Sequence, residues 1–148
     1  MGNTKVEIKN MTLMKIIEKS PFLSDFYIWT AVDSDIRLSG SIINSALEIS
    51  PSCRLLCISA KYSIENKNYE IAEQQLKLAA NMIPGRLEPK RLLFKLYLSQ
   101  NRLNEAKEIG ELILSMPLKI EGGASLIVKH EIKRLMHENN ILTFFSDI

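Results

Sequence analysis

The sequence has few residues of the types that build metal, disulfide or nucleic-acid sites. Its 148 residues include two histidines, two cysteines and one tryptophan, and the formal net charge is only +2. Nucleic-acid-binding domains carry a clustered excess of positive charge, and the near balance of 19 basic and 17 acidic residues gives no such indication. With 46% hydrophobic and 24% charged residues, the composition is that of a globular protein.

Long apolar segments are also lacking. A membrane-spanning helix needs about 20 mostly apolar residues, and the longest apolar runs here, such as Leu55–Ala60 and Leu112–Leu114, are short and interrupted. Residues 1–10 have no apolar signal-peptide core. The sequence therefore predicts a soluble domain, which would need a segment outside these residues to take it into another compartment.

The few chemically reactive side chains do not form a recognisable site. Cys53 and Cys57 share one face of a helix, and because a disulfide within one helix closes only a short loop, we expect two buried thiols. His130 and His137 are about 10.5 Å apart along a helix, too far to share a metal ion directly. We expect no catalytic residue, cofactor or metal; an enzyme would require a fold that brings Cys57 to a histidine.

The chain does contain an internal repeat. The separation of Ala72 and Ala106 equals the length of a tetratricopeptide repeat, a pair of antiparallel helices with a period of about 34 residues. Large and small residues follow the order of that repeat around both alanines: Leu56, Ala60, Tyr69, Leu76, Ala79 and Pro84 in one copy, and Leu93, Phe94, Tyr97, Leu103 and Pro117 in the next. A weaker copy lies upstream, with Ser39 in the alanine position. The small residues let paired helices approach closely, and stacked pairs bury their remaining apolar faces.

The predicted fold is all-α. We expect a tetratricopeptide-like right-handed superhelix of antiparallel helix pairs, with about three repeats and a C-terminal capping helix. One domain spans residues 1–148. Its parts are a leading helix, a degenerate repeat, two clear repeats and the capping helix, at residues 1–20, 21–51, 53–84, 87–117 and 121–139.

Three motifs in the clear repeats resemble a known family. They are Pro84-Gly-Arg-Leu-Glu-Pro-Lys-Arg-Leu-Leu-Phe-Lys-Leu-Tyr97, Asn104-Glu-Ala-Lys107 and Met116-Pro-Leu-Lys-Ile-Glu121. Over residues 54–136 the chain is similar to the C-terminal domain of O-antigen polymerase and ligase family membrane proteins of Bacteroides-type bacteria. It departs from that family at Gly85, where asparagine is usual, and at Gly110, where a larger residue is usual.

The resemblance implies a non-catalytic interaction or scaffold domain. It would be the periplasmic, soluble part of an inner-membrane protein of lipopolysaccharide biosynthesis, tethered to a membrane-embedded polymerase or ligase. The membrane part that would carry glycan transfer is not in these residues, so no catalytic role is transferred to any position. The alternative is a free-standing cytoplasmic tetratricopeptide adaptor that binds acidic peptide tails.

The repeat register also predicts a binding face. In tetratricopeptide arrays, outward positions of the first helix of each pair line the concave surface. Here these positions are Arg54, Cys57, Lys61 and Ile64 in one repeat, and Glu88, Arg91, Lys95 and Leu98 in the next. Their four basic residues favour a groove for a partner protein's carboxylates or an anionic glycan. The competing interpretation is a solvated face whose charges only keep the domain soluble.

Leu93 provides a test of this register. The pattern places its side chain in the core, together with the aromatic rings of Trp29, Tyr69, Phe94 and Tyr97. Leu93→Ala is therefore expected to lower the free energy of unfolding by about 2–5 kcal/mol, because truncating a buried side chain leaves a cavity. Urea denaturation measures the effect, and a change near zero would show that the register is displaced.

Overall fold

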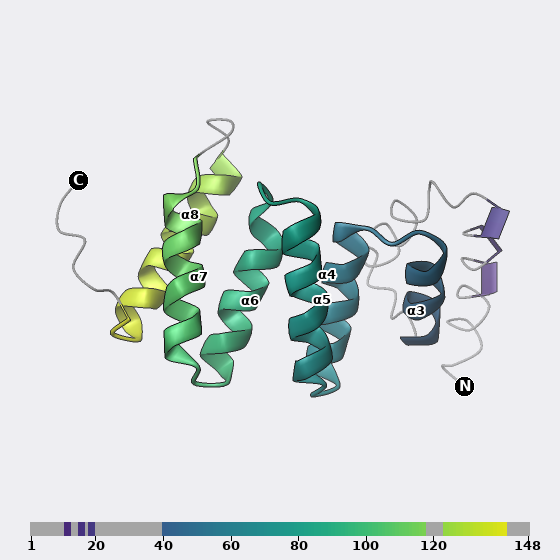
Figure 1. Cartoon of the computed structure of the whole chain (residues 1–148), viewed down its shortest axis with the longest axis horizontal. Helices are drawn as coiled ribbons and strands as arrows, with labels where there is room; N and C mark the ends of the chain where they lie inside the picture. The colour runs from purple at the N-terminus through teal and green to yellow at the C-terminus, as the bar shows by residue number, and fades with distance from the viewer. Residues whose placement is uncertain (1–10, 13–14, 17, 20–39, 118–122, 142–148) are drawn as a thin grey trace. The chain divides into compact units, whose positions relative to one another are not determined.

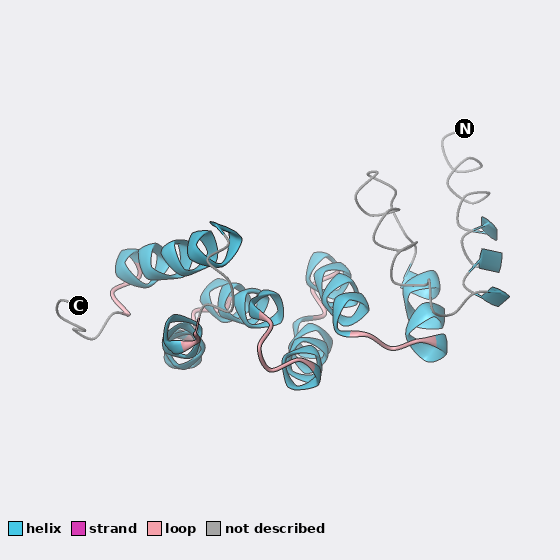
Figure 2. Cartoon of the chain, turned by 90° about the horizontal axis from the view of Figure 1, so that it is seen from above, coloured by secondary structure: helices cyan, strands magenta, loops and turns pink. Residues whose placement is uncertain are grey.

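The computed structural model describes residues 11–12, 15–16, 18–19, 40–117 and 123–141 (Figure 1). These residues form helices joined by loops and turns, without a strand, so the all-α prediction is confirmed for them (Figure 2). The described positions of the predicted leading helix are helical, whereas most of the degenerate repeat, with Trp29, lies outside the described residues. None of the helices in this part of the chain combines the length and apolarity needed to cross a bilayer.

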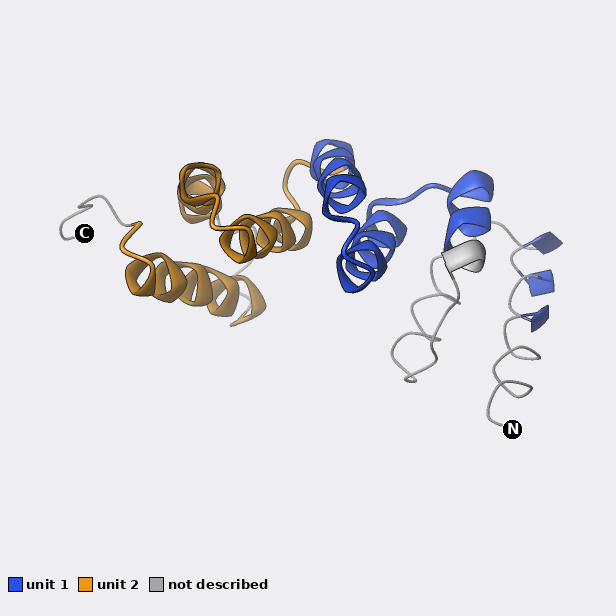
Figure 3. Ribbon diagram, turned by 90° about the horizontal axis from the view of Figure 1, so that it is seen from below, with its two compact units in different colours: residues 1–82 blue, residues 83–148 orange. Residues whose placement is uncertain are grey.

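Two compact units divide the chain, at residues 1–82 and 83–148, where the sequence alone predicts one domain (Figure 3). Unit 1 contains α3 (Gly40–Ile49), α4 (Cys53–Glu65) and α5 (Tyr69–Met82). Unit 2 contains α6 (Leu87–Ser99), α7 (Leu103–Ser115) and α8 (Gly123–Glu138). In unit 1, α4 packs against both α3 and α5; in unit 2, α6, α7 and α8 all pack against one another.

The helix bounds of the two clear pairs recur with one spacing, the same that separates Ala72 from Ala106. Helix α6 begins and ends one such repeat length after α4, and α7 begins one repeat length after α5 (53 to 87, 65 to 99 and 69 to 103). The sequence period found between two alanines is thus also the period of the helices themselves. Helix α5 begins two residues after Lys67, the residue in the turn that ends α4. Helix α7 likewise begins two residues after Asn101, the residue in the turn that ends α6.

The turn at the end of each first helix repeats as well. Lys67 after α4 and Asn101 after α6 have left-handed backbones, with φ of 62° and 57°. Each donates its amide to the carbonyl three residues back, and the next amide donates to the carbonyl five residues back, at 2.8–3.0 Å. This is the Schellman arrangement, which satisfies carbonyls that a helix end leaves unpaired. Helix α8 ends in the same arrangement at Asn140, φ 53°, so the predicted capping helix has the C-terminus of a first helix.

The two pairs fill one equivalent gap with opposite residues. In the α4–α5 pair the two positions hold Ala60 on the first helix and Leu76 on the second, and both are fully buried. One repeat later these positions hold Phe94 and Gly110, which are also buried. A Cβ on Gly110 would lie 3.1 Å from Phe94 Cε2 and 2.6 Å from Met136 Sδ of α8. Gly110 therefore makes room both for the phenylalanine ring and for the third helix of unit 2.

Most of the predicted core residues are buried. Leu93, Phe94 and Tyr97 are at most 3% exposed, as the register predicts. Tyr69 is 36% exposed, so the prediction that it packs in the core is wrong. Tyr69 is the first residue of α5, and side chains in a helix lean toward its N-terminus, so this ring extends past the helix end. Leu103, the first residue of α7, is exposed to a similar degree.

The exchange of large and small residues predicts a specific rescue. Phe94→Ala should lower the free energy of unfolding by about 3–5 kcal/mol through a cavity, and Gly110→Leu by about 1–3 kcal/mol through overpacking. The double variant restores the alanine and leucine of the first pair, so it should be at least about 1 kcal/mol more stable than the two single effects summed.

Urea denaturation of the four proteins gives this coupling directly. A matched control combines Phe94→Ala with Leu112→Ser, which changes an exposed residue of the same helix α7. Those two changes should add within about 0.5 kcal/mol. Additivity in the Phe94→Ala/Gly110→Leu variant would mean that the two positions do not share one space.

Candidate functional site

The residues predicted to line a basic groove lie on α4 in unit 1 and on α6 in unit 2. On α4, Arg54 is half-buried and Lys61 is exposed. Cys57 does not line a surface, because its side chain is only 5% exposed. Cys53 and Cys57 are both buried free thiols, which confirms the expectation for the cysteine pair and removes Cys57 from the candidate binding face.

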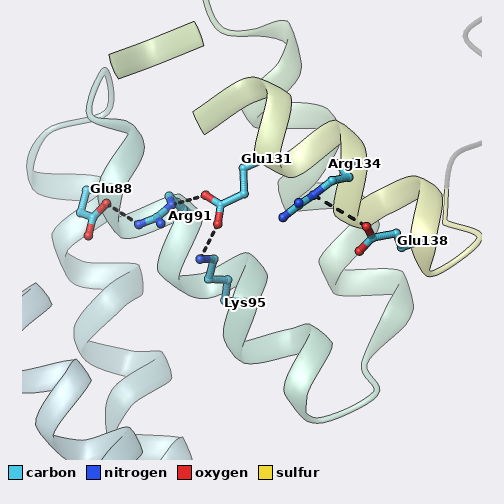
Figure 4. A network of polar contacts seen from close by, with 6 residues as sticks. All are labelled: Glu88, Arg91, Lys95, Glu131, Arg134 and Glu138. Atoms are coloured by element: carbon cyan, nitrogen blue, oxygen red, sulfur yellow. Dashed lines mark hydrogen bonds and ion pairs between the residues drawn. The ribbon is translucent and has the colours of Figure 1, made fainter. Parts of the chain in front are cut away.

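The α6 members of the predicted groove hold a carboxylate of the same chain. Arg91 Nε donates to Glu131 Oε2 at 2.7 Å, and Lys95 Nζ lies 2.6 Å from Glu131 Oε1. Figure 4 shows Glu131 reaching from α8 to both cations, with Glu88 on the other side of Arg91. Glu88 Oε2 accepts from Arg91 Nη1 at 3.2 Å. We call Arg91, Lys95 and Glu131 the Glu131 clamp. Leu98, one turn after Lys95 on α6, is half-buried and takes no part in the polar contacts of the clamp.

Packing on either side of Glu131 sets the geometry of the clamp. Ile132 and Met136 are at most 1% exposed, so they fix the rotation of α8 about its axis. Lys129 anchors the helix a second time, because its ammonium donates to the Leu114 carbonyl at 2.9 Å and to the Met116 carbonyl. These carbonyls end α7, where the helix dipole also favours a positive charge. With α8 fixed in this way, Glu131 faces α6.

The clamp is electrostatically strong for a surface ion pair. The hydrogen bonds from Arg91 and then Lys95 lower the pKa of Glu131 to about 2. The same hydrogen bond raises the pKa of Arg91 above its usual value. The Glu131 side chain is only 22% exposed, so water and salt screen this interaction less than a fully exposed pair. Any anionic ligand at this point of α6 would therefore have to compete with Glu131.

Unit 1 contains a buried polar cluster that is satisfied internally. Gln75 Nε2 donates to Ser59 Oγ at 2.8 Å, and Ser63 Oγ donates to Gln75 Oε1 at 3.3 Å. The equivalent positions in the second pair hold apolar or aromatic residues: Leu93, Tyr97 and Ile109. The cluster joins α4 to α5 and presents no polar group directed at a ligand.

Metal-ligating side chains do not gather in the described part of the chain. No group of three or more histidine, cysteine, aspartate or glutamate residues there is placed to hold an ion. His130 and His137 are both exposed on α8. What the described residues offer chemically is recognition of carboxylates by paired cations, and on α6 that capacity is already used by Glu131.

Sequence reasoning missed Glu131, the residue that decides the state of the basic face. A signal was present in the sequence. Glu131 is the one acidic residue in a basic segment that also contains Lys129, Lys133 and Arg134. Its partner lies 40 residues earlier in the chain. No short-range pattern links positions at that separation, so only the docking of α8 shows the pair.

The clamp predicts a loss of stability in acid. Because the folded pKa of Glu131, about 2, is below its usual 4.5, the ionised carboxylate stabilises the folded state above pH 4.5. That contribution is lost as the pH falls from 4.5 toward 2. At pH 7, Glu131→Gln should lower the free energy of unfolding by about 1–3 kcal/mol, and it should flatten the acid-dependent loss.

Urea denaturation at pH 7 and at intervals down to pH 2.5 tests this. Glu138→Gln is the matched control, since Glu138 meets Arg134 at 3.7 Å with both side chains more than half exposed. It should cost less than about 1 kcal/mol. Equal acid slopes for the unmodified chain and Glu131→Gln would show that the clamp does not stabilise the fold.

Comparisons with known proteins found no match. No family model matches the chain, and no curated protein or solved structure matches it either. Function is therefore inferred from the geometry of the two units and from the residue patterns of the sequence.

Proposed function

We propose that this chain is a non-catalytic, tetratricopeptide-like scaffold, coiled as a right-handed superhelix, that holds a partner protein or an anionic glycan. The observation that carries the proposal is the recurrence of helix bounds and Schellman turns at the spacing of Ala72 and Ala106. Arrays of such pairs place successive first helices side by side, and this gives extended surfaces that suit elongated partners.

The cellular setting that we propose follows from the family resemblance. The chain would be the periplasmic, soluble part of an O-antigen or surface-polysaccharide polymerase or ligase. Motifs over residues 54–136 support this setting. A cytoplasmic adaptor for acidic peptide tails is the second candidate, favoured by Leu126 and Ile127 on α8, which are exposed apolar side chains that suit a peptide better than a glycan.

The Glu131 clamp narrows where an anionic partner would bind. Arg91 and Lys95 are both paired with Glu131, and Arg91 also pairs with Glu88, so the α6 face is less basic than the sequence suggests. The first role of these two cations is to hold α8 against α6. We therefore place the contact with an anionic partner outside the clamp.

Two anionic probes test the proposal. Oligoglutamate represents an acidic protein segment and oligogalacturonate an anionic glycan, each titrated into the chain by isothermal calorimetry. At least one should bind, more weakly in about 200 mM than in about 50 mM NaCl because salt screens the attraction, and neither should be chemically changed. Oligoglutamine is the uncharged control. Failure of both anionic probes to bind, or their conversion to a product, would contradict the proposed function.

A charge-swapped variant separates recognition from folding. Arg91→Glu combined with Glu131→Arg keeps the net charge and reverses the Arg91–Glu131 ion pair, while it removes the original cation and gives up the contacts with Lys95 and Glu88. If the partner binds outside the clamp, the affinity of the chain for the anionic probe that binds it should change by less than about threefold. A loss of about tenfold or more would mean that the partner displaces Glu131 from Arg91.

A further inference from the structure

The solvent-facing side of α8 forms a stripe of basic residues that begins with two apolar ones. Its members, which we call the α8 outer face, are Leu126, Ile127, His130, Lys133, Arg134 and His137. All six are exposed. We propose that this face docks an acidic segment of a partner protein in which a large apolar side chain lies next to carboxylates. The inference rests on the proposed scaffold function and assigns it a surface and a ligand chemistry.

Helical spacing aligns the outer face. At 3.6 residues per turn, Leu126, His130, Lys133 and His137 lie within about 60° of one another around the helix axis. They span about 16 Å along it. A helical partner segment of about three turns covers the length of this face, and a slightly longer one extends past its ends.

The apolar end of the outer face is not part of the core of unit 2. Leu126 is 42% exposed and Ile127 is 68% exposed, the highest value among the large hydrophobic residues that the structure describes. The opposite side of α8 contributes the buried Ile132 and Met136. Because α8 already docks through that side, Leu126 and Ile127 remain available to contact a partner.

The charged members of the outer face, Lys133 and Arg134, are both cations, and the exposed acid Glu138 follows one turn after Arg134. From Leu126 to His137, no exposed residue is acidic, and the acid in this stretch, Glu131, is held by α6. Lys133 has no ion pair among the residues that the structure describes, and Arg134 meets Glu138 only at 3.7 Å in an exposed pair. Arg91 and Lys95 of α6 are paired with carboxylates within unit 2, whereas Lys133 offers its charge to a partner. Complementarity therefore requires carboxylates on that partner.

The combination of apolar and basic residues distinguishes a peptide from other anions. A glycan carries no apolar side chain to cover Leu126 and Ile127. A bilayer surface would cover them, but helices that lie in a membrane interface have apolar residues along their whole length, and here the apolar residues stand at one end. An acidic peptide with one apolar anchor matches both parts of the face.

Fluorescence anisotropy with a designed peptide tests the proposal. The probe is a labelled helical peptide of about four turns, with leucines in one terminal turn and glutamates at every third or fourth position thereafter. Two control peptides replace the glutamates by glutamine or the leucines by serine. The probe should bind in about 50 mM NaCl, and either replacement should weaken its binding about fivefold or more.

Variants of the chain locate the contact. Lys133→Glu should weaken binding of the probe about tenfold and Ile127→Ser about threefold or more, and both positions are exposed, so circular dichroism should show an unchanged fold. The matched control is Lys77→Glu on α5, a lysine that is 57% exposed and pairs with Glu73 at 2.7 Å. Lys77→Glu should leave the affinity of the chain for the peptide probe unchanged.

The outcomes that overturn the proposal differ from those that overturn the scaffold function. If an anionic probe binds but Lys133→Glu and Ile127→Ser have no effect, the α8 outer face is not the docking surface and the scaffold function stands. If vesicles of phosphatidylcholine and phosphatidylglycerol bind in an Ile127-dependent manner while the peptide does not, the partner is a membrane surface and the proposal fails. If neither the peptide nor the other anionic probes bind, both proposals fail.

Discussion

Close approach of helices at small side chains is the constraint on which the described fold depends. Ala72, Ala79 and Ala106 are fully buried where helices of a pair meet. At Gly110 the small residue does more, because α7 there contacts both Phe94 of α6 and Met136 of α8. A larger residue at that position would require the side chains of Met136 and Phe94 to shift. One glycine thus contributes to the packing of all three helices of unit 2.

Because of the Glu131 clamp, the basic face of α6 is not an open binding site for a carboxylate. Two cations four residues apart on one helix would ordinarily be taken as a carboxylate-binding site. In unit 2 they are such a site, and the carboxylate comes from α8 of the same chain. Burial of Ile132 and Met136 sets the rotation of α8, so Lys133 of that helix faces solvent without a carboxylate partner among the described residues, whereas Arg91 and Lys95 of α6 are paired with Glu131. Core packing therefore decides which charges a partner can meet.

The predictable part of the fold is the part that depends on local pattern. The spacing of Ala72 and Ala106 identified the period at which helix bounds recur, and the periodicity of large residues placed Leu93 and Tyr97 in the core. Errors arose where position within a helix matters more than residue type. Tyr69 is exposed because it begins a helix, and Cys57 is buried although its register position was assigned to the binding face.

The sequence by itself determined the helices and their period, because these follow from apolar spacing and turn chemistry within a few residues. Only the tertiary structure decided the state of the candidate site. Glu131 and Arg91 are 40 residues apart, and their contact requires α8 to dock on α6 and α7 with one rotation about its axis. That rotation is set by the burial of Ile132 and Met136, and Met136 packs beside Gly110 of α7 and Phe94 of α6. A charge pattern read along the chain contains no information on such a three-way fit.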